Sequence, residues 1–174
     1  ILSNAIHSNN LLGVDLTSPS SFMGVTPNDP GDLDTGGNTL QNFPVLTFAG
    51  SAGGTTSIVG NFGSTPNTTF RLEFFANDAC DPSGFGEGQT LLGSVGVTTD
   101  ASGSVSFSVN LSAAVVQGQA ITATATNSDH GTSEFSRCVA AAQGVASDIP
   151  VLSFEMRILL TVALAAIGFL FLAR

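Results

Sequence analysis

A turn-rich stretch between residues 28 and 38 concentrates side chains that suit a metal ion. Asp32, Asp34, Gly36 and Asn38 fall at alternate positions within it. Alternate spacing in a glycine-bearing loop lets carboxylate, amide and carbonyl oxygens converge on one hard cation, as calcium requires. The stretch is not an EF-hand, because the flanking helices and the glutamate at position twelve are absent. The sequence therefore predicts either a weak calcium site or an acidic, solvated turn, and calcium is the one cofactor it suggests.

The two cysteines, Cys80 and Cys138, are the next candidates for chemistry. A metal site would need more soft ligands nearby, and a nucleophilic cysteine would need a paired base. An exported protein with two cysteines usually pairs them. We expect a disulfide, which would stabilise the fold by about 4 kcal/mol on a chain-entropy argument.

Three carboxylates, Asp78, Asp81 and Glu87, lie in one loop rich in glycine and proline. A pair of acids can hydrolyse a glycosidic bond, but acids in such loops are far more often turn formers and solubilising charges. Neither a Gly-x-Ser-x-Gly elbow nor a glycine-rich phosphate loop occurs. We expect no catalytic residue and no enzyme activity in this chain.

Seven short strands are expected between residues 45 and 140. In several of them apolar and polar residues alternate, which is typical of strands with one buried face. Turn residues separate the strands at roughly even spacing. Seven such strands predict an all-β fold, an antiparallel β-sandwich of immunoglobulin-like layout. The expected strands are Val45–Ala49, Thr55–Phe62, Thr69–Ala76, Gln89–Thr98, Ser104–Leu111, Ala120–Asn127 and Ser133–Val139.

Composition restricts the partners of this chain. Its 174 residues include four arginines, no lysine and thirteen acidic residues, for a net charge of −9. A nucleic-acid partner would require a basic patch, and the sequence offers none. Glycine is abundant and tryptophan and tyrosine are absent, which favours short strands with many turns and argues against a sugar platform.

Two segments precede the expected sandwich. In residues 1–16 aliphatic residues alternate with asparagines, as in one rung of a right-handed parallel β-helix, and a rung requires stacked neighbours to bury a core. The alternative is a loosely attached strand. Residues 17–44 form a connector whose prolines and glycines oppose regular structure.

The stretches LEFFANDACDPSGFGEGQTLLGSVGVTTDASGSVSFSVNL and QAITATATNSDHGTSEFSRC carry a family resemblance. They resemble the immunoglobulin-like modules that follow β-helix repeats in large bacterial surface and secreted proteins. The resemblance covers about residues 1–140 and implies a structural or adhesive module with no catalytic residues.

The C-terminal residues have a different composition. After a small-residue linker at 141–148, the run 158–173 is uncharged and almost wholly apolar, and Arg174 ends the chain. As a helix this run would span about 24 Å, short of the ~30 Å hydrocarbon core of a bilayer. It is apolar on all sides, which favours a single marginal transmembrane helix over a buried helix of a soluble domain.

The motif before this run is Ile149-Pro150-Val151-Leu152-Ser153. It resembles the C-terminal sorting signals of bacterial exported proteins that open Ile-Pro-Thr-Leu-Ser, continue into a hydrophobic span and end in arginine. Val151 stands in place of the usual threonine. The resemblance implies sorting at the inner membrane of a Gram-negative bacterium by an exosortase-type enzyme, and residues 149–174 as the sorting tail.

Together these features predict a non-catalytic structural or adhesive module, exported to the cell surface or beyond. Its expected partners are the inner membrane and a sorting enzyme, and then extracellular matrix or glycan. The first residues show no charged region followed by an apolar region, so we expect no leader in this chain, and we expect the chain to be the C-terminal part of a longer protein. The alternative is the accessory C-terminal region of an extracellular β-helix enzyme acting on carbohydrate, which rests on fold analogy.

Overall fold

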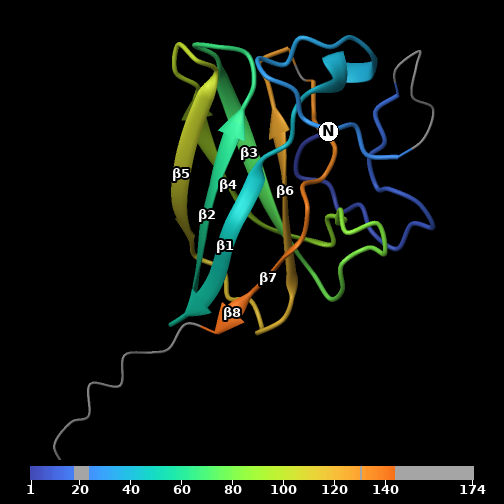
Figure 1. Cartoon of the computed structure of the whole chain (residues 1–174). Helices are drawn as coiled ribbons and strands as arrows, with labels where there is room; N and C mark the ends of the chain where they lie inside the picture. The colour runs from blue at the N-terminus through green and yellow to red at the C-terminus, as the bar shows by residue number, and fades with distance from the viewer. Residues whose placement is uncertain (18–23, 130, 144–174) are drawn as a thin grey trace, which may run out of the picture. The chain divides into compact units, whose positions relative to one another are not determined.

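A computed structural model describes residues 1–17, 24–129 and 131–143 of the chain. Within them two four-stranded sheets face each other, in the orders β5-β2-β1-β8 and β4-β3-β6-β7 (Figure 1). The only helical element in these residues is a short 3-10 turn, η1. The elements are η1 Gly37–Leu40, β1 Val45–Ala52, β2 Thr55–Gly63, β3 Thr69–Asn77, β4 Thr90–Thr98, β5 Ser104–Leu111, β6 Ala120–Thr126, β7 Val139–Ala140 and β8 Ala142–Gln143.

The space between the sheets is filled by the apolar residues of the alternating pattern. Phenylalanine dominates this core. The rings of Phe62 and Phe70 meet edge to face with centroids 4.9 Å apart, and the ring centroids of Phe74 and Phe107 are 5.8 Å apart. Phe62, Phe70 and Phe74 are at most 2% exposed, so each contributes roughly 1.5–3 kcal/mol of burial. The all-β sandwich predicted from the sequence is confirmed, and six of the seven expected strands are present.

Glycine and aspartate fix the turns between strands. Gly53 and Gly54 both have positive φ, at 58° and 82°, the combination that a two-residue hairpin turn matching strand twist requires. In the turn that joins β4 to β5, which lie in different sheets, Asp100 accepts hydrogen bonds from the backbone of Ser102 and Ser104. The hydrogen bond from the Ser102 hydroxyl, followed by those from the backbone N–H groups of Ser104 and Ser102, holds the pKa of Asp100 below its ordinary value.

The seventh expected strand, Ser133–Val139, is wrong as a regular strand, since only Val139–Ala140 pairs with β6. The backbone N–H groups of Ser133 and Ser136 donate to the carbonyls of Ala125 and Ala123. The hydroxyls of the same two serines accept from the backbone N–H groups of Ala125 and Ala123. From Ser133 to Ser136 this segment advances by three residues, while β6 advances by two, from Ala125 to Ala123. The serine hydroxyls accept the hydrogen bonds that backbone carbonyls would accept in a regular strand, and the alternation of residue types does not reveal this.

The outer face of β3 and β6 is covered by further chain rather than by solvent. All seven residues of β6 are buried, although the alternation predicts one exposed face. A second apolar cluster lies on this outer face, and its rings Phe75 and Phe135 meet at 5.5 Å. The cluster comprises Val14, Leu16, Leu40, Phe75 and Phe135, with Ile6 packed against it. The N-terminal segment thus forms a third layer on one side of the sandwich (Figure 1).

This third layer bears on the expected β-helix rung. Residues 1–16 contain no strand, and Ile6 makes a single β-bridge with Gly88. They belong with the connector and the sandwich to one compact unit, Ile1–Gly144. The rung stays a prediction, because the described residues include no neighbouring rung on which it could stack.

The sorting tail, with its motif at 149–153 and its apolar run at 158–173, lies outside the described residues. The linker 141–148 is described only as far as residue 143, where β8 joins the edge of β1. Within the described part of the chain, no helix has the length and apolar character needed to cross a membrane.

Candidate metal centre

The connector between residues 24 and 44 is held in place by asparagine side chains that act as backbone substitutes. The amide of Asn28 donates to the carbonyl of Phe43 at 2.8 Å and accepts from its N–H at 2.9 Å. The amide of Asn42 makes the same reciprocal pair with the backbone of Asp29, at 2.7 Å and 3.0 Å. These pairs fix residues 28–29 against residues 42–43, and so position the acidic turn that begins at Asp29.

Three carboxylates converge in this turn. Asp29, Asp32 and Asp34 each offer an oxygen, and these oxygens all lie within 4.8 Å of one another. Among the described residues this is the only group of three or more acidic, histidine or cysteine side chains so close together. We call Asp29, Asp32 and Asp34 the acidic triad.

Asp32 anchors the triad to the sandwich. One of its oxygens accepts from the amide of Gln41 at 2.8 Å and from the hydroxyl of Ser64 at 2.6 Å. The other accepts from the backbone N–H of Asn42 at 3.0 Å. Because three hydrogen bonds hold this carboxylate, its position is set by the fold and does not depend on a ligand.

The triad also contains carboxylate oxygens without a partner. Oδ1 of Asp29 and Oδ1 of Asp34 are buried and make no hydrogen bond to any described residue. A buried carboxylate oxygen without a donor loses its hydration without compensation, which costs roughly 1–3 kcal/mol or more for a charged group. A divalent cation would supply the missing charge partner.

The electrostatics of the triad agree with this geometry. Burial raises the pKa of Asp32 above its ordinary value, against the lowering effect of its hydrogen bonds, and the charge of Asp29 raises it further. Burial also raises the pKa of Asp34, followed by the negative charges of Asp29 and Asp32. The folded chain therefore holds the carboxylates of Asp32 and Asp34 in an environment that disfavours their ionised form. A bound cation would reverse that preference.

Two of the four predicted calcium ligands belong to the acidic triad, and the other two have partners elsewhere. Asp32 and Asp34 come together, joined by Asp29, which the alternate spacing did not single out. Asn38 lies in η1 and donates its amide to the carbonyl of Thr132 at 3.0 Å. The backbone carbonyl of Gly36 accepts from the N–H of Thr39. Gly36 and Asn38 thus have protein partners, and their part in metal binding stays a prediction.

The carboxylates of the 78–87 loop each have a hydrogen-bond partner of their own. Asp78 accepts from the amide of Gln89 at 2.9 Å, and Asp81 accepts from the backbone N–H of Ser83 at 2.8 Å, as turn-forming aspartates do. Glu87 reaches across to the N-terminal segment. The three do not form a group of ligand atoms of the kind seen in the acidic triad.

Glu87 and Glu73 bind the backbone of the N-terminal segment. Glu87 accepts from the N–H groups of Ser8 and Asn9 at 2.6 Å and 2.9 Å. Glu73 is only 1% exposed, and it accepts from the N–H of Ser3 at 2.9 Å. Its other oxygen forms an ion pair with Arg71 at 3.0 Å. These charge-assisted bonds hold residues 1–9 to the sandwich.

Glu134 binds the backbone of the chain at Leu16 and Thr26. It is buried, and its two oxygens accept from the N–H groups of Leu16 and Thr26, each at 2.8 Å. Burial raises its pKa, although the two N–H groups oppose that shift. Sequence reasoning missed this role, because a glutamate that binds backbone N–H groups more than one hundred residues away leaves no local pattern.

The expected disulfide is present between Cys80 and Cys138, whose Cα atoms are 6.0 Å apart. Around it the 80–88 loop is bound to the segment after β6. The N–H of Cys138 donates to the carbonyl of Gly84 at 3.1 Å, and the guanidinium of Arg137 lies over the ring of Phe85. The disulfide therefore closes a long loop across the layer that covers β6.

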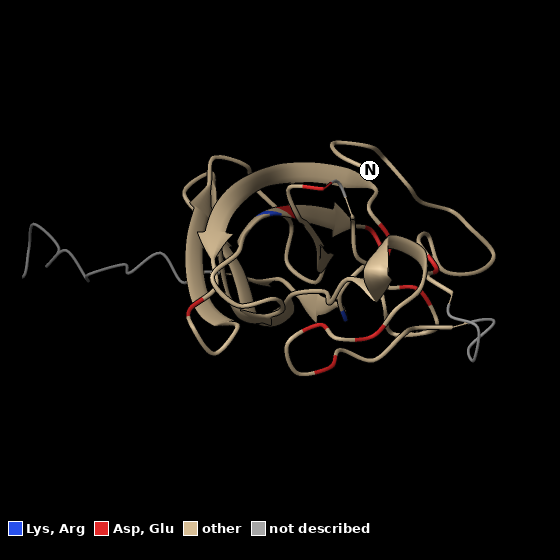
Figure 2. Ribbon diagram, turned by 90° about the horizontal axis from the view of Figure 1, so that it is seen from above, with Lys and Arg blue, Asp and Glu red and all other residues tan. Residues whose placement is uncertain are grey.

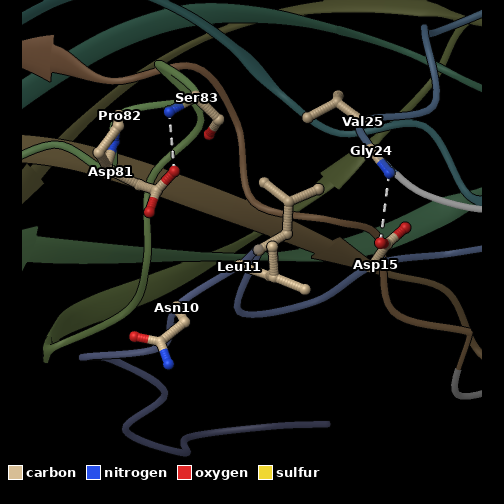
Figure 3. Close-up of a pocket in the computed structure, with 9 residues that line it drawn as sticks. Asn10, Leu11, Asp15, Gly24, Val25, Asp81, Pro82 and Ser83 are labelled. Atoms are coloured by element: carbon tan, nitrogen blue, oxygen red, sulfur yellow. Dashed lines mark hydrogen bonds between the residues drawn. The ribbon is translucent and has the colours of Figure 1, made fainter.

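A hollow of about 390 Å³ opens between the N-terminal segment and the 81–83 turn. The apolar side chains of Leu11, Val25 and Pro82 line it, with Asp15 and Asp81 at its sides (Figure 3). Both aspartates accept backbone hydrogen bonds, from Gly24 and Ser83. The hollow shares no residue with the acidic triad.

Comparisons with known proteins show no family for this chain. No family model and no curated protein matches the chain. Among solved structures the chain is similar to the BSP domain of a biofilm-associated protein, with a TM-score of 0.41 and 17% sequence identity. The match covers 63% of this chain and 15% of that one. At this level of similarity nothing about function follows from it.

Proposed function

We propose that this chain is a non-catalytic structural module of an exported bacterial protein, displayed at the cell surface or released from it. The observation that carries the proposal is the Cys80–Cys138 disulfide. Disulfides form and persist in oxidising compartments, at cell surfaces and in secreted proteins, and are rare in the cytosol. The lysine-free composition with a net charge of −9 is compatible with such a solvent-exposed location.

The third layer supports a structural role. Buried glutamates bind the N-terminal segment along its length, and a second apolar cluster lies beneath it. A segment bound at several separated points moves with the sandwich as one body, which suits a spacer or an adhesive module. The immunoglobulin-like layout inferred from the sequence belongs to this proposal, as does sorting through the motif Ile149-Pro150-Val151-Leu152-Ser153.

Calcium binding at the acidic triad is part of the same proposal. The two partnerless buried oxygens of Asp29 and Asp34 support it, together with the pre-positioned carboxylate of Asp32. Millimolar calcium outside the cell would suffice for a site of modest affinity, since extracellular modules bind with dissociation constants of about 10⁻⁴–10⁻³ M. The cation would tie the connector to the sandwich and would take part in no reaction.

Accessibility on intact cells tests the proposed location. An epitope inserted at the exposed turn beside Val116 would be stained by antibody on unbroken cells and removed by added protease. A cytoplasmic marker in the same cells serves as the control and should survive. Protection of the epitope until the cells are lysed, in cells and medium alike, would contradict the proposal.

A further inference from the structure

The two sheets have four edge strands, and three of them are poor templates for pairing. β7 and β8 contain two residues each. The pairing of β4 with β3 is broken by a register shift, and Gly93 of β4 has φ of 153°. Short edges and bulged edges are devices by which proteins avoid pairing with another chain.

The fourth edge, β5, has none of these devices. It pairs with β2 without a register shift over all eight residues from Ser104 to Leu111. It contains no proline and no charged residue. Its outward side chains are small and exposed, and none of them blocks the approach of another strand. They are Ser104, Ser106, Ser108 and Asn110.

The distribution of charge favours a second copy of this chain as the occupant of that edge. The molecule carries a net charge of −9, so most approaches between two copies bring like charges together. The strands of the β5-β2-β1-β8 sheet contain no charged residue. Viewed from above, the acidic residues lie mainly along the loops and leave these strands without charge (Figure 2). This side is therefore where two acidic copies meet without repulsion.

The sequence of β5 is nearly symmetric about Phe107. It reads Ser104-Val105-Ser106-Phe107-Ser108-Val109-Asn110. Residues at equal distances before and after Phe107 are of the same type, except that Asn110 corresponds to Ser104 at the ends. Two such strands aligned antiparallel around a two-fold axis place apolar residues opposite apolar residues on the core side. On the solvent side they place hydroxyl and amide groups opposite each other. A one-residue slip would destroy both matches.

We propose that two copies of this chain pair antiparallel through β5, with Phe107 opposite Phe107 of the second copy. The contact is isologous and closes on itself, and it joins two four-stranded sheets into one eight-stranded sheet. This inference deepens the proposed function, because it makes a second copy a partner of the surface module. It is tested on purified protein, so its failure would leave the cell-surface location untouched.

The register gives a charge-swap test. Residue 106 of one copy faces residue 108 of the other, so Ser106→Lys/Ser108→Lys places two lysine pairs directly opposite each other. Ser106→Glu/Ser108→Glu does the same with glutamates. Because both positions are exposed, neither variant should unfold the sandwich, and thermal unfolding checks this. The control Val116→Lys/Ser128→Lys adds the same charge at exposed loop positions.

Association is measured by analytical ultracentrifugation of the full-length chain in mild detergent. The wild-type chain and each variant are run alone, and the lysine and glutamate variants are also run as an equimolar mixture. We expect the wild-type chain and the loop control to dimerise, and each charged variant alone to have a dissociation constant raised about tenfold or more. An equimolar mixture of the lysine and glutamate variants should dimerise again. A monomeric wild-type chain at high micromolar concentration would overturn the proposal. So would undiminished dimerisation of either charged variant, or failure of the mixture to associate.

Discussion

Asp34→Asn should abolish stabilisation by calcium without harming the fold. Oδ1 of Asp34 has no hydrogen-bond partner among the described residues, so the substitution removes a charge and few contacts. Asp32 is a poorer choice, because it accepts three hydrogen bonds from Gln41, Asn42 and Ser64. Its loss would destabilise the connector whether or not calcium binds, by about 1–3 kcal/mol.

The size of the calcium effect follows from mass action. A ligand that binds only the folded state stabilises it by RT ln(1 + [L]/Kd). For a dissociation constant of about 0.1–1 mM and about 5 mM calcium, the gain is roughly 1–2 kcal/mol. In a domain of this size such a gain raises the melting temperature by about 3–10 °C.

The pH dependence has a defined sign. The folded-state pKa values of Asp32 and Asp34 are raised above the ordinary value of 3.8. Without calcium, these groups therefore contribute stability that is present below that value and lost as the pH rises through their folded-state pKa. Calcium binds the ionised carboxylates, so its stabilising effect should be large at neutral pH and should be lost as the pH falls through the raised pKa values of Asp32 and Asp34.

Thermal unfolding followed by circular dichroism, with calcium and with chelator, is the assay. Asp129→Asn is the matched control: Asp129 is exposed in a turn outside the acidic triad, and this variant should keep the full calcium response. Asp34→Asn should melt at or above the wild-type temperature in chelator and gain nothing from calcium. An equal gain in wild type and Asp34→Asn, or no gain in wild type, would refute the calcium site.

Further changes probe other parts of the structure. Replacing both cysteines by Cys80→Ser/Cys138→Ser should lower the free energy of unfolding in urea by about 4 kcal/mol, since the bridge spans 58 residues; an unchanged midpoint would argue against it. Glu134→Ala leaves the buried N–H of Leu16 and the half-buried N–H of Thr26 without an acceptor and should cost about 2 kcal/mol, with faster amide exchange in the N-terminal segment than in the sandwich. Gly103→Ala should destabilise the fold by more than 1 kcal/mol, because φ is 81° and an added Cβ would lie 2.3 Å from a backbone carbonyl; unaltered stability would contradict this geometry. Mass spectrometry of the mature protein should place its C-terminus near Ser147–Leu152, whereas an intact Arg174 would indicate that the tail is retained.

The sandwich itself is readable from the sequence because its strands follow local rules. Alternation in β3 and β5 reports which side chains face the core, and glycine or aspartate marks each turn. The two cysteines could be paired from composition alone. These features depend on residues close together in the chain or on a count, and neither needs knowledge of the tertiary structure.

The third layer could not be read in this way. Thr122 of β6 is buried beneath the 80–88 loop, where its hydroxyl donates to the carbonyl of Glu87 at 2.6 Å, 35 residues earlier in the chain. The N-terminal segment is held by Glu134, which accepts from Leu16 118 residues away. The serines that replace a regular seventh strand have the same residue types as an exposed edge. Asp29 joins the triad only because Asn42 binds its backbone. Each of these outcomes rests on hydrogen bonds that involve a side chain, and such bonds leave no periodic signal in the sequence.

The redox state of Cys80 and Cys138 in living cells reports whether this module is exported to an oxidising compartment. Thiols would be blocked in intact cells before lysis with a membrane-permeant alkylating reagent, and the protein would then be digested without reduction and analysed by mass spectrometry. We predict a peptide pair linked through Cys80 and Cys138 and no alkylated cysteine. Recovery of the protein with both cysteines alkylated would contradict export to an oxidising compartment.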